Sequence, residues 1–234
     1  MPNYRRAWHP GGTYFFTVNL LQRHGNDLLL RHIDELRAAV RATRRRHPFE
    51  IHGWVVLPDH LHCVISLPPG DADFAIRWRL IKLLFSRAIP LAEWRNPARL
   101  RRGERGIWQR RYWEHLIRDD ADFAAHMDYV HINPLKHGLV ARVRDWPYST
   151  FHRLVEDGVY TLDWAGGADE ILGYGDCHPA CCAALRTRPT FFPTSTASPH
   201  ANIHAACSPT GGQLPAAVLR MRANSACSAA MTGC

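Results

Sequence analysis

Short runs rich in aromatic and β-branched residues alternate along the chain with segments whose apolar residues recur at helical spacing. Such runs are typical of strands, whereas the periodic segments are typical of amphipathic helices. The runs predict strands over residues 13–21, 49–57, 60–67 and 107–118. The periodic segments predict helices over residues 33–46 and 74–88. Residues 90–106, which are rich in arginine, are expected to form a loop.

A further helix is expected after the fourth strand, because Asp119 or Asp120 can cap it and the stretch 134–138 can end it. Residues 58–59 predict a tight turn that joins the second and third strands into a hairpin. The order β-α-β-β-α-β, followed by a helix, predicts a ferredoxin-like α+β fold with an appended helix. Such a fold has an antiparallel sheet with helices on one face, and the other face is available for a ligand or the appended helix. The third strand is expected to be central.

His60 and His62 lie on the third predicted strand, with one residue between them. Side chains at positions i and i+2 of a strand project from the same face, so the two imidazoles would lie side by side. This spacing predicts half of a metal site, or a pair of phosphate-binding groups. Taken alone the pair is a weak signal, because two histidines can alternate on a half-exposed strand by chance.

The appended helix carries Tyr129, with Asn133 four residues later and His126 three residues earlier. These spacings place the three side chains on one helix face. A histidine pair that faces a tyrosine suits metal-assisted attack of a phenolate on a phosphodiester, which leaves a covalent phosphotyrosine. Mg²⁺ or Mn²⁺ would serve, and either Asn133 or His126 could supply a third ligand. Taken alone, Tyr129 is more simply interpreted as a packing residue.

The net charge of +8 and the pI near 9.4 favour a nucleic-acid partner, and arginine supplies nearly all of the positive charge. A GC-rich genome could explain the ratio of arginine to lysine, but it would not explain the net charge. Basic residues interleaved with aromatic ones could follow phosphates while the rings stack on bases. The candidate DNA contacts are Arg5, Arg6, Arg77, Arg79, Lys82, Arg110 and Arg111. For each one, a solvated surface position is an equally good interpretation.

The composition changes near residue 175, so we divide the chain into a patterned domain over residues 1–174 and a tail over residues 175–234. The tail is rich in proline, alanine and serine, holds six of the seven cysteines, and shows no sustained period, which predicts little order. Its cysteine and histidine spacings match no ordinary zinc module. We expect the tail to be dispensable for folding.

No apolar run approaches a membrane span and no signal peptide is visible, so a cytoplasmic protein is expected.

Three motifs together resemble the REP-associated tyrosine transposases, which are single-tyrosine members of the HUH superfamily. They are the strand His60-Leu61-His62, the helix segment DYVHINPLKHGLV with Tyr129 and Asn133, and the following DWPYSTFHR. The resemblance covers roughly residues 2–174. It implies an enzyme that binds and cleaves single-stranded DNA folded as a short REP-type hairpin, through a 5′-phosphotyrosine and with Mg²⁺ or Mn²⁺.

Carried over by position, the resemblance makes Tyr129 the nucleophile, His60 and His62 the metal ligands, and Asn133 the residue that completes the metal site. Two other interpretations remain open: a hairpin-binding protein without activity, and a metal phosphodiesterase that uses water, with Tyr129 only packing. No protein partner is indicated, and either a monomer or a homodimer is compatible with the sequence. The aromatic segment 146–151 is expected to dock on the sheet.

Overall fold

A computed structural model describes residues 8–91, 93, 95 and 97–166. Within this part of the chain, four strands form one antiparallel sheet in the order β2-β3-β1-β4. The strands are β1 (Thr13–Asn19), β2 (Glu50–Val56), β3 (His60–Ser66) and β4 (Trp113–Leu116). This is the ferredoxin-like α+β arrangement that the sequence predicts, and the histidine strand β3 is central as expected. β3 pairs with β1 from Ser66 opposite Thr13 to His60 opposite Asn19.

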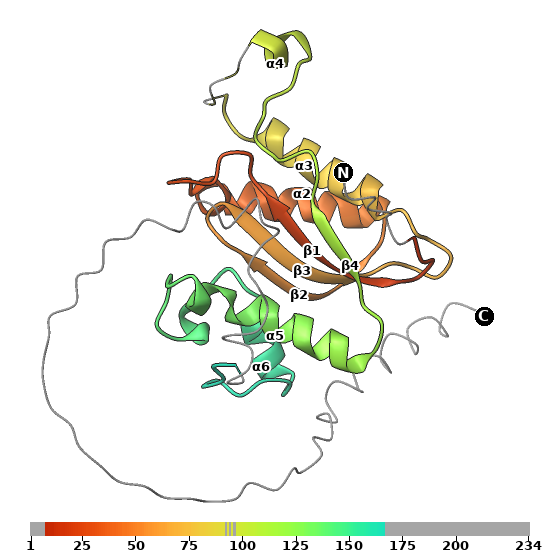
Figure 1. Ribbon diagram of the computed structural model, residues 1–234, viewed down its shortest axis with the longest axis vertical. Coiled ribbons are helices and arrows are strands. Elements are labelled where there is room, and N and C mark those ends of the chain that lie inside the picture. The colour runs from red at the N-terminus through yellow and green to blue at the C-terminus, as the bar shows by residue number, and fades with distance from the viewer. Residues whose placement is uncertain (1–7, 92, 94, 96, 167–234) are drawn as a thin grey trace, which may run out of the picture. The chain divides into compact units, whose positions relative to one another are not determined.

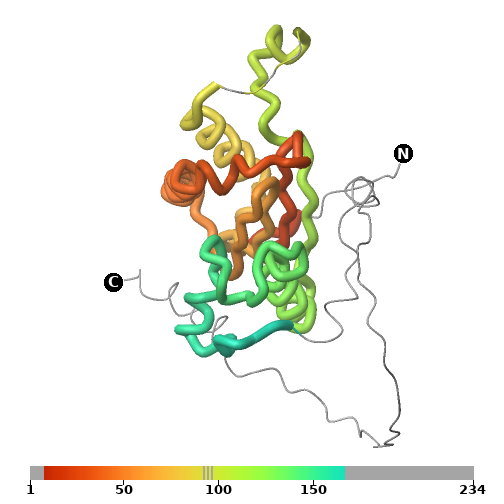
Figure 2. Tube along the Cα trace, turned by 90° about the vertical axis from the view of Figure 1, so that its left-hand side faces the viewer, coloured from red at the N-terminus to blue at the C-terminus, as the bar shows by residue number. Residues whose placement is uncertain are grey.

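Helices cover both faces of the sheet (Figures 1 and 2). On one face lie α2 (Ile33–Arg46) and α3 (Phe74–Ala88), both with the predicted bounds, and α1 (Leu28–Arg31) precedes them. The other face carries α5 (Asp120–Lys136), which crosses β2 and β3. The chain continues through a short 3-10 helix, η1 (Val143–Asp145), and α6 (Phe151–Glu156). No helix among the described residues is long and apolar enough to cross a membrane.

The main core fills the space between the sheet and the α2–α3 pair. Phe16 on β1 contacts Trp78 and Phe74 on α3, and Leu36 on α2 is equally buried. Alternate residues of β1 therefore face opposite layers, because Phe15 points to the α5 side and contacts Tyr129. Because both faces of the sheet are buried, the sequences of β1 and β3 are nearly continuous apolar runs.

The region between α3 and α5 differs from the sequence prediction in two ways. The expected strand over residues 107–118 shortens to β4, and the arginine-rich segment before it contains the short helix α4 (Pro97–Arg101). Within the part of the expected strand that precedes β4, Trp108 forms an isolated β-bridge with Leu20. The ring of Trp108 packs on Phe85, and that of Tyr112 packs on Phe16. The aromatic pattern therefore reflects packing on the core rather than pairing in the sheet.

The segment after η1 docks along the free edge of β2, as expected from its aromatic residues. Trp146 Nε1 donates to the Val56 carbonyl at 3.0 Å, and the Val56 N–H donates to the Tyr148 carbonyl at 2.8 Å. The Thr150 N–H donates to the Trp54 carbonyl at 2.9 Å. These bonds satisfy backbone groups that an edge strand would otherwise leave open. The motif DWPYSTFHR thus closes the sheet edge.

Candidate active site

Polar side chains of the two central strands gather on the α5 side of the sheet. His60 and His62 lie opposite Asn19 and Thr17, respectively, on β1. The imidazole centroids are 4.9 Å apart, the rings are nearly perpendicular, and each residue is only 2% exposed. Because β3 is paired on both sides, the two imidazoles are held on a rigid support.

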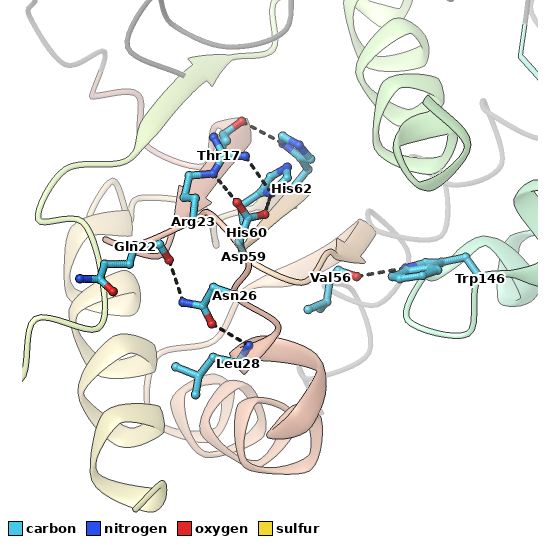
Figure 3. A network of polar contacts seen from close by, with 10 residues as sticks. All are labelled: Thr17, Gln22, Arg23, Asn26, Leu28, Val56, Asp59, His60, His62 and Trp146. Carbon is cyan, nitrogen blue, oxygen red and sulfur yellow. Dashed lines mark hydrogen bonds and ion pairs between the residues drawn. The ribbon is translucent and has the colours of Figure 1, made fainter. Parts of the chain in front are cut away.

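An acidic residue in the β2–β3 turn orients the first histidine (Figure 3). His60 Nδ1 lies 2.5 Å from Asp59 Oδ1, and Arg23 Nε donates to Asp59 Oδ2 at 2.6 Å. Burial alone would raise the pKa of Asp59, but the hydrogen bond with His60 and the Arg23 guanidinium hold it below its ordinary value. An ionised Asp59 favours the tautomer of His60 with the proton on Nδ1. That tautomer leaves Nε2 as a potential ligand atom.

The second histidine has one bonded nitrogen and one orphaned nitrogen. His62 Nδ1 lies 2.9 Å from Thr17 Oγ1, also drawn in Figure 3, while Nε2 is buried with no hydrogen-bond partner among the described residues. Burial, with the positive charges of neighbouring groups, moves the pKa of His62 well below its ordinary value. The ring is therefore neutral. With its proton on Nδ1, it presents a buried lone pair on Nε2, which is the form that binds a metal ion.

Tyr129, Asn133 and His137 follow one another at four-residue spacing along α5 and its cap, opposite the histidine pair. The Tyr129 ring lies 5.3 Å from that of His62, and the His137 ring lies 5.3 Å from that of His60. Asn133, between them on the helix, is fully buried. Its Nδ2 donates to the Tyr129 carbonyl, whereas its Oδ1 has no hydrogen-bond partner in the described part of the chain.

The donor set fits a divalent cation. A buried acceptor without a partner costs about 1–3 kcal/mol, so orphaned atoms such as His62 Nε2 and Asn133 Oδ1 point to a missing ligand. Imidazole nitrogens and an amide oxygen are acceptable ligands for Mn²⁺ and, less readily, for Mg²⁺. His60, His62 and Asn133 are the residues that could hold such an ion.

Lys136 also lies at this site, although it is not among the residues predicted from the sequence. Its Nζ lies 5.3 Å from the centre of the Tyr129 ring. The helical period could have found Lys136 and His137, which follow Tyr129 by seven and eight residues and so share its face. The site therefore combines a phenol, an ammonium group and a cluster of imidazoles on two elements.

Comparison with known proteins identifies the family. A REP-associated tyrosine transposase of Escherichia coli K12 is 49% identical over 171 residues, which make up 73% of this chain and 95% of the relative. The chain belongs to the REP-associated tyrosine transposase family. A Haemophilus influenzae protein assigned to the same family is 48% identical over 171 residues, or 72% of this chain and 96% of that protein. No family model matches the chain.

A solved structure of a REP-associated tyrosine transposase bound to a REP hairpin has a TM-score of 0.63 and 48% identity. The match covers 71% of this chain and 93% of that one. The family resemblance, the fold class and the transposase-type enzyme that the sequence predicts are thereby confirmed. Arg5, Arg6 and the tail from residue 175 lie outside the described residues, so the expectations for them stay predictions.

His126 belongs to a different cluster of this transposase and does not join the histidine pair. Its Nδ1 lies 3.0 Å from Asp122 Oδ1, and its ring stacks on His115 at 4.5 Å. His115 is on β4, and β1 with Phe15 separates β4 from β3. The suggestion that His126 supplies the third metal ligand is therefore corrected. Ligand atoms of His115, Asp122 and His126 lie within 4.8 Å and could themselves hold an ion, but hydrogen bonds already connect them.

Arg77 is a structural residue of the transposase rather than a DNA contact, which corrects the sequence-based suggestion. Its side chain is 1% exposed and donates to the Pro48 carbonyl, the Asp73 carbonyl and Asp71 Oδ2. The hydrogen bond from Arg77 holds the pKa of Asp71 below its ordinary value. The guanidinium is not accessible to a phosphate, because it is buried against the loop that follows α2.

Arg77→Ala should therefore lower the free energy of unfolding by about 3 kcal/mol, since buried acceptors would lose their partner. Arg79→Ala, two residues away on the exposed side of α3, should change it by less than about 0.5 kcal/mol. Urea unfolding followed by circular dichroism measures both. Equal stability of the two variants would contradict the structural role of Arg77.

The other DNA candidates among the described residues gather on the α3 side of the sheet, away from Tyr129. Arg79, Lys82 and Arg110 line a groove of about 660 Å³ between α3 and residues 103–112, and Arg111 is exposed beside it. Lys82 Nζ lies 5.9 Å from the Trp108 ring and 5.1 Å from the Tyr112 ring. The aromatic and basic residues are thus interleaved as expected, but they form a surface separate from the histidine site.

Proposed function

We propose that this transposase cleaves single-stranded DNA at REP-type hairpins and rejoins it through a 5′-phosphotyrosine on Tyr129. One observation carries the proposal: the Tyr129 ring lies against His62 at a site with two orphaned, buried acceptor atoms, His62 Nε2 and Asn133 Oδ1. A tyrosine with only a packing role would not require two unsatisfied acceptor atoms at the same site. A hairpin-bound relative supports the hairpin as the DNA partner.

His60, His62 and Asn133 would hold Mg²⁺ or Mn²⁺ in this proposal. When bound, such an ion withdraws negative charge from the oxygens of the scissile phosphate. The chain's own residues prepare the ligands: Asp59 orients His60, and burial keeps His62 neutral. A neutral His62 does not have to lose a proton before it binds the ion.

Tyr129 would attack through its phenolate oxygen. A free phenol has a pKa of about 10, so the hydroxyl proton must leave as the bond to phosphorus forms. The nearby Lys136 ammonium stabilises the phenolate and the negative charge on phosphate. The bond from phosphorus to the 3′ oxygen breaks, and that oxygen takes up a proton and leaves as a free hydroxyl. The phosphotyrosine retains the energy of the broken bond for rejoining.

The direct test incubates the purified chain with end-labelled hairpins that carry single-stranded flanks, with Mn²⁺ or Mg²⁺ present. A labelled protein band on a denaturing gel is the expected result. Free cleaved DNA without an adduct under any quench would favour a phosphodiesterase that uses water. Hairpin binding without cleavage would favour a binding protein that has lost activity.

The chain's only two lysines provide a matched test of the site. Lys136→Gln should slow single-turnover cleavage of saturating hairpin by about 100-fold, as expected when a charge-stabilising group is removed. Lys82→Gln removes the same charge in the groove beside α3, so it should weaken hairpin binding but leave the rate of the bound complex unchanged. Identical cleavage rates for both variants at saturation would argue against a role for Lys136.

We infer that the transposase acts in the cytoplasm, where cellular DNA would be its substrate. All the residues proposed for cleavage come from one chain, so a monomer could carry out the reaction and a homodimer is also compatible with it. The one described cysteine, Cys63, is buried and free. The proposal requires no disulfide in the part of the chain that the structure describes.

A further inference from the structure

The cluster of His115, Asp122 and His126 lies where α5 follows β4. Asp122 and His126 are four residues apart on α5 and share a helix face, and His115 on β4 faces them. His115 Nε2 lies 3.0 Å from Asp122 Oδ1 and 2.9 Å from Asp122 Oδ2. His126 Nδ1 lies 3.0 Å from Asp122 Oδ1. Both imidazoles therefore direct a nitrogen at the same carboxylate.

Phe15 on β1 separates this cluster from the histidine pair of the active site. The centre of its ring lies 4.9 Å from that of His126 and 5.6 Å from that of His62. One ion cannot bind both sets of ligands across an aromatic ring, because bonds from a metal ion to nitrogen or oxygen are only about 2.0–2.2 Å long. An ion at the cluster would therefore be separate from the ion of the active site.

The distances within the cluster fit direct coordination of a metal ion. An ion with bonds of about 2.1 Å holds two ligand atoms about 3 Å apart when they lie at a right angle about the metal. The contacts of both imidazoles with Asp122 have this length, and one ligand atom of each residue lies within 4.8 Å of the other two. A neutral imidazole can carry its proton on either nitrogen. An ion can therefore replace the hydrogen bonds without a large movement of its ligands.

Burial and charge prepare the cluster for a cation. The side chains of Asp122 and His126 are 8% and 7% exposed, whereas that of His115 is 24% exposed and leaves an approach from solvent. Burial alone would raise the pKa of Asp122, but hydrogen bonds from His115 and the Arg118 N–H hold it below its ordinary value. Burial lowers the pKa of His126. At neutral pH the carboxylate is therefore ionised and the His126 imidazole is neutral, which are the forms that bind metal ions.

We propose that His115, Asp122 and His126 form a second metal site, which binds a divalent transition-metal ion such as Mn²⁺ or Zn²⁺. Two imidazoles and one carboxylate favour these ions over Mg²⁺ and Ca²⁺, whose preferred ligands are oxygens. The ion would join the edge strand β4 to the first turns of α5, the helix that carries Tyr129. Its role is structural, because the ion fixes the start of α5 and does not contact the reacting phosphate.

Bound Mn²⁺ can be counted in the full chain without DNA, because the thiols of the cysteine-rich tail are poor ligands for this ion. The chain would be titrated with Mn²⁺ and the free ion measured by electron paramagnetic resonance. We expect two bound ions for the wild type, and one each for His115→Gln and His62→Gln. Glutamine keeps a hydrogen-bond donor for Asp122 but lacks the imidazole ligand. His152→Gln changes an exposed histidine of α6 and should still bind two.

Thermal unfolding gives a second measurement, because an ion that binds only the folded chain raises its melting temperature. The His62→Gln background removes a ligand of the active site and so isolates the second site. Saturating Mn²⁺ should raise the melting temperature of His62→Gln by about 5 °C relative to EDTA. The double variant with His115→Gln should gain less than about 1 °C. Each variant is compared with itself, so any loss of stability from the substitution cancels.

Either measurement can overturn the second site. It is ruled out if His115→Gln binds as many Mn²⁺ ions as the wild type. It is also ruled out if Mn²⁺ stabilises the double variant as much as it stabilises His62→Gln, because the three residues would then form only a hydrogen-bond network. Neither measurement involves DNA, so both remain decisive whether or not Tyr129 forms an adduct.

Discussion

Tyr129→Phe is expected to abolish the covalent DNA adduct and to reduce strand cleavage by at least about 1,000-fold. The substitution removes only the phenolic oxygen, and the ring can keep its contacts with Phe15 and His62. Hairpin affinity should therefore stay within about twofold, because binding depends on phosphate and base contacts spread over many groups. Denaturing gels with end-labelled hairpin measure the adduct, and anisotropy measures binding.

Tyr160→Phe is the matched control. Tyr160 also loses only a hydroxyl, which donates to Asp128 Oδ1, and its ring packs with Phe151 and Trp164 away from the histidine pair. Adduct formation should persist in this variant. An adduct that forms equally well on the Tyr129→Phe chain would rule out Tyr129 as the nucleophile. Full cleavage by that chain without any adduct would favour attack by water.

His62→Gln should reduce cleavage by at least about 100-fold while hairpin affinity and stability change little. The one hydrogen bond that the substitution disturbs is that between His62 Nδ1 and Thr17 Oγ1, worth about 1 kcal/mol, because Nε2 has no partner among the described residues. Affinity for Mn²⁺, measured by calorimetry without DNA, should fall with activity. This second readout separates a ligand from a residue that only shapes the site.

His152→Gln is the control for that variant. His152 is exposed on α6, where its Nε2 contacts the Arg144 carbonyl, and it should affect neither Mn²⁺ binding nor cleavage. The assignment of His62 fails if Mn²⁺ affinity is unchanged. It fails in a second way if a well-folded His62→Gln chain no longer binds the hairpin, because binding and chemistry would then not be separable.

The local parts of the fold and site follow from the sequence. Helices α2 and α3 have the predicted bounds because their apolar spacing and flanking residues are local signals. The side-by-side arrangement of His60 and His62 follows from the two-residue period of a strand, wherever that strand lies in the sheet. In the same way, the helical period brings Tyr129 and Asn133 to one face of α5.

The tertiary structure decided which residues on that face meet the histidine pair. His126, Tyr129 and Asn133 share a helix face, but α5 extends from the end of β4 across the sheet to β2 and β3. His126 therefore meets His115 on β4, while Asn133 lies on the part of α5 that crosses the histidine strand. The direction in which a helix crosses a sheet depends on long-range packing, which no spacing along the chain encodes.

Burial likewise decided the roles of the arginines. Arg77 and Arg79 are two residues apart and look equivalent in the sequence, but only the packing of α3 against the end of α2 buries Arg77. A groove at the β2 edge joins residues 33–56 to residues 147–153, whose proximity depends on the docking of Trp146 and Thr150. The periodicity of the sequence thus determined which residues each strand and helix presents on a given face. Only the tertiary structure decided which of these faces meet, because burial is a property of elements packed together.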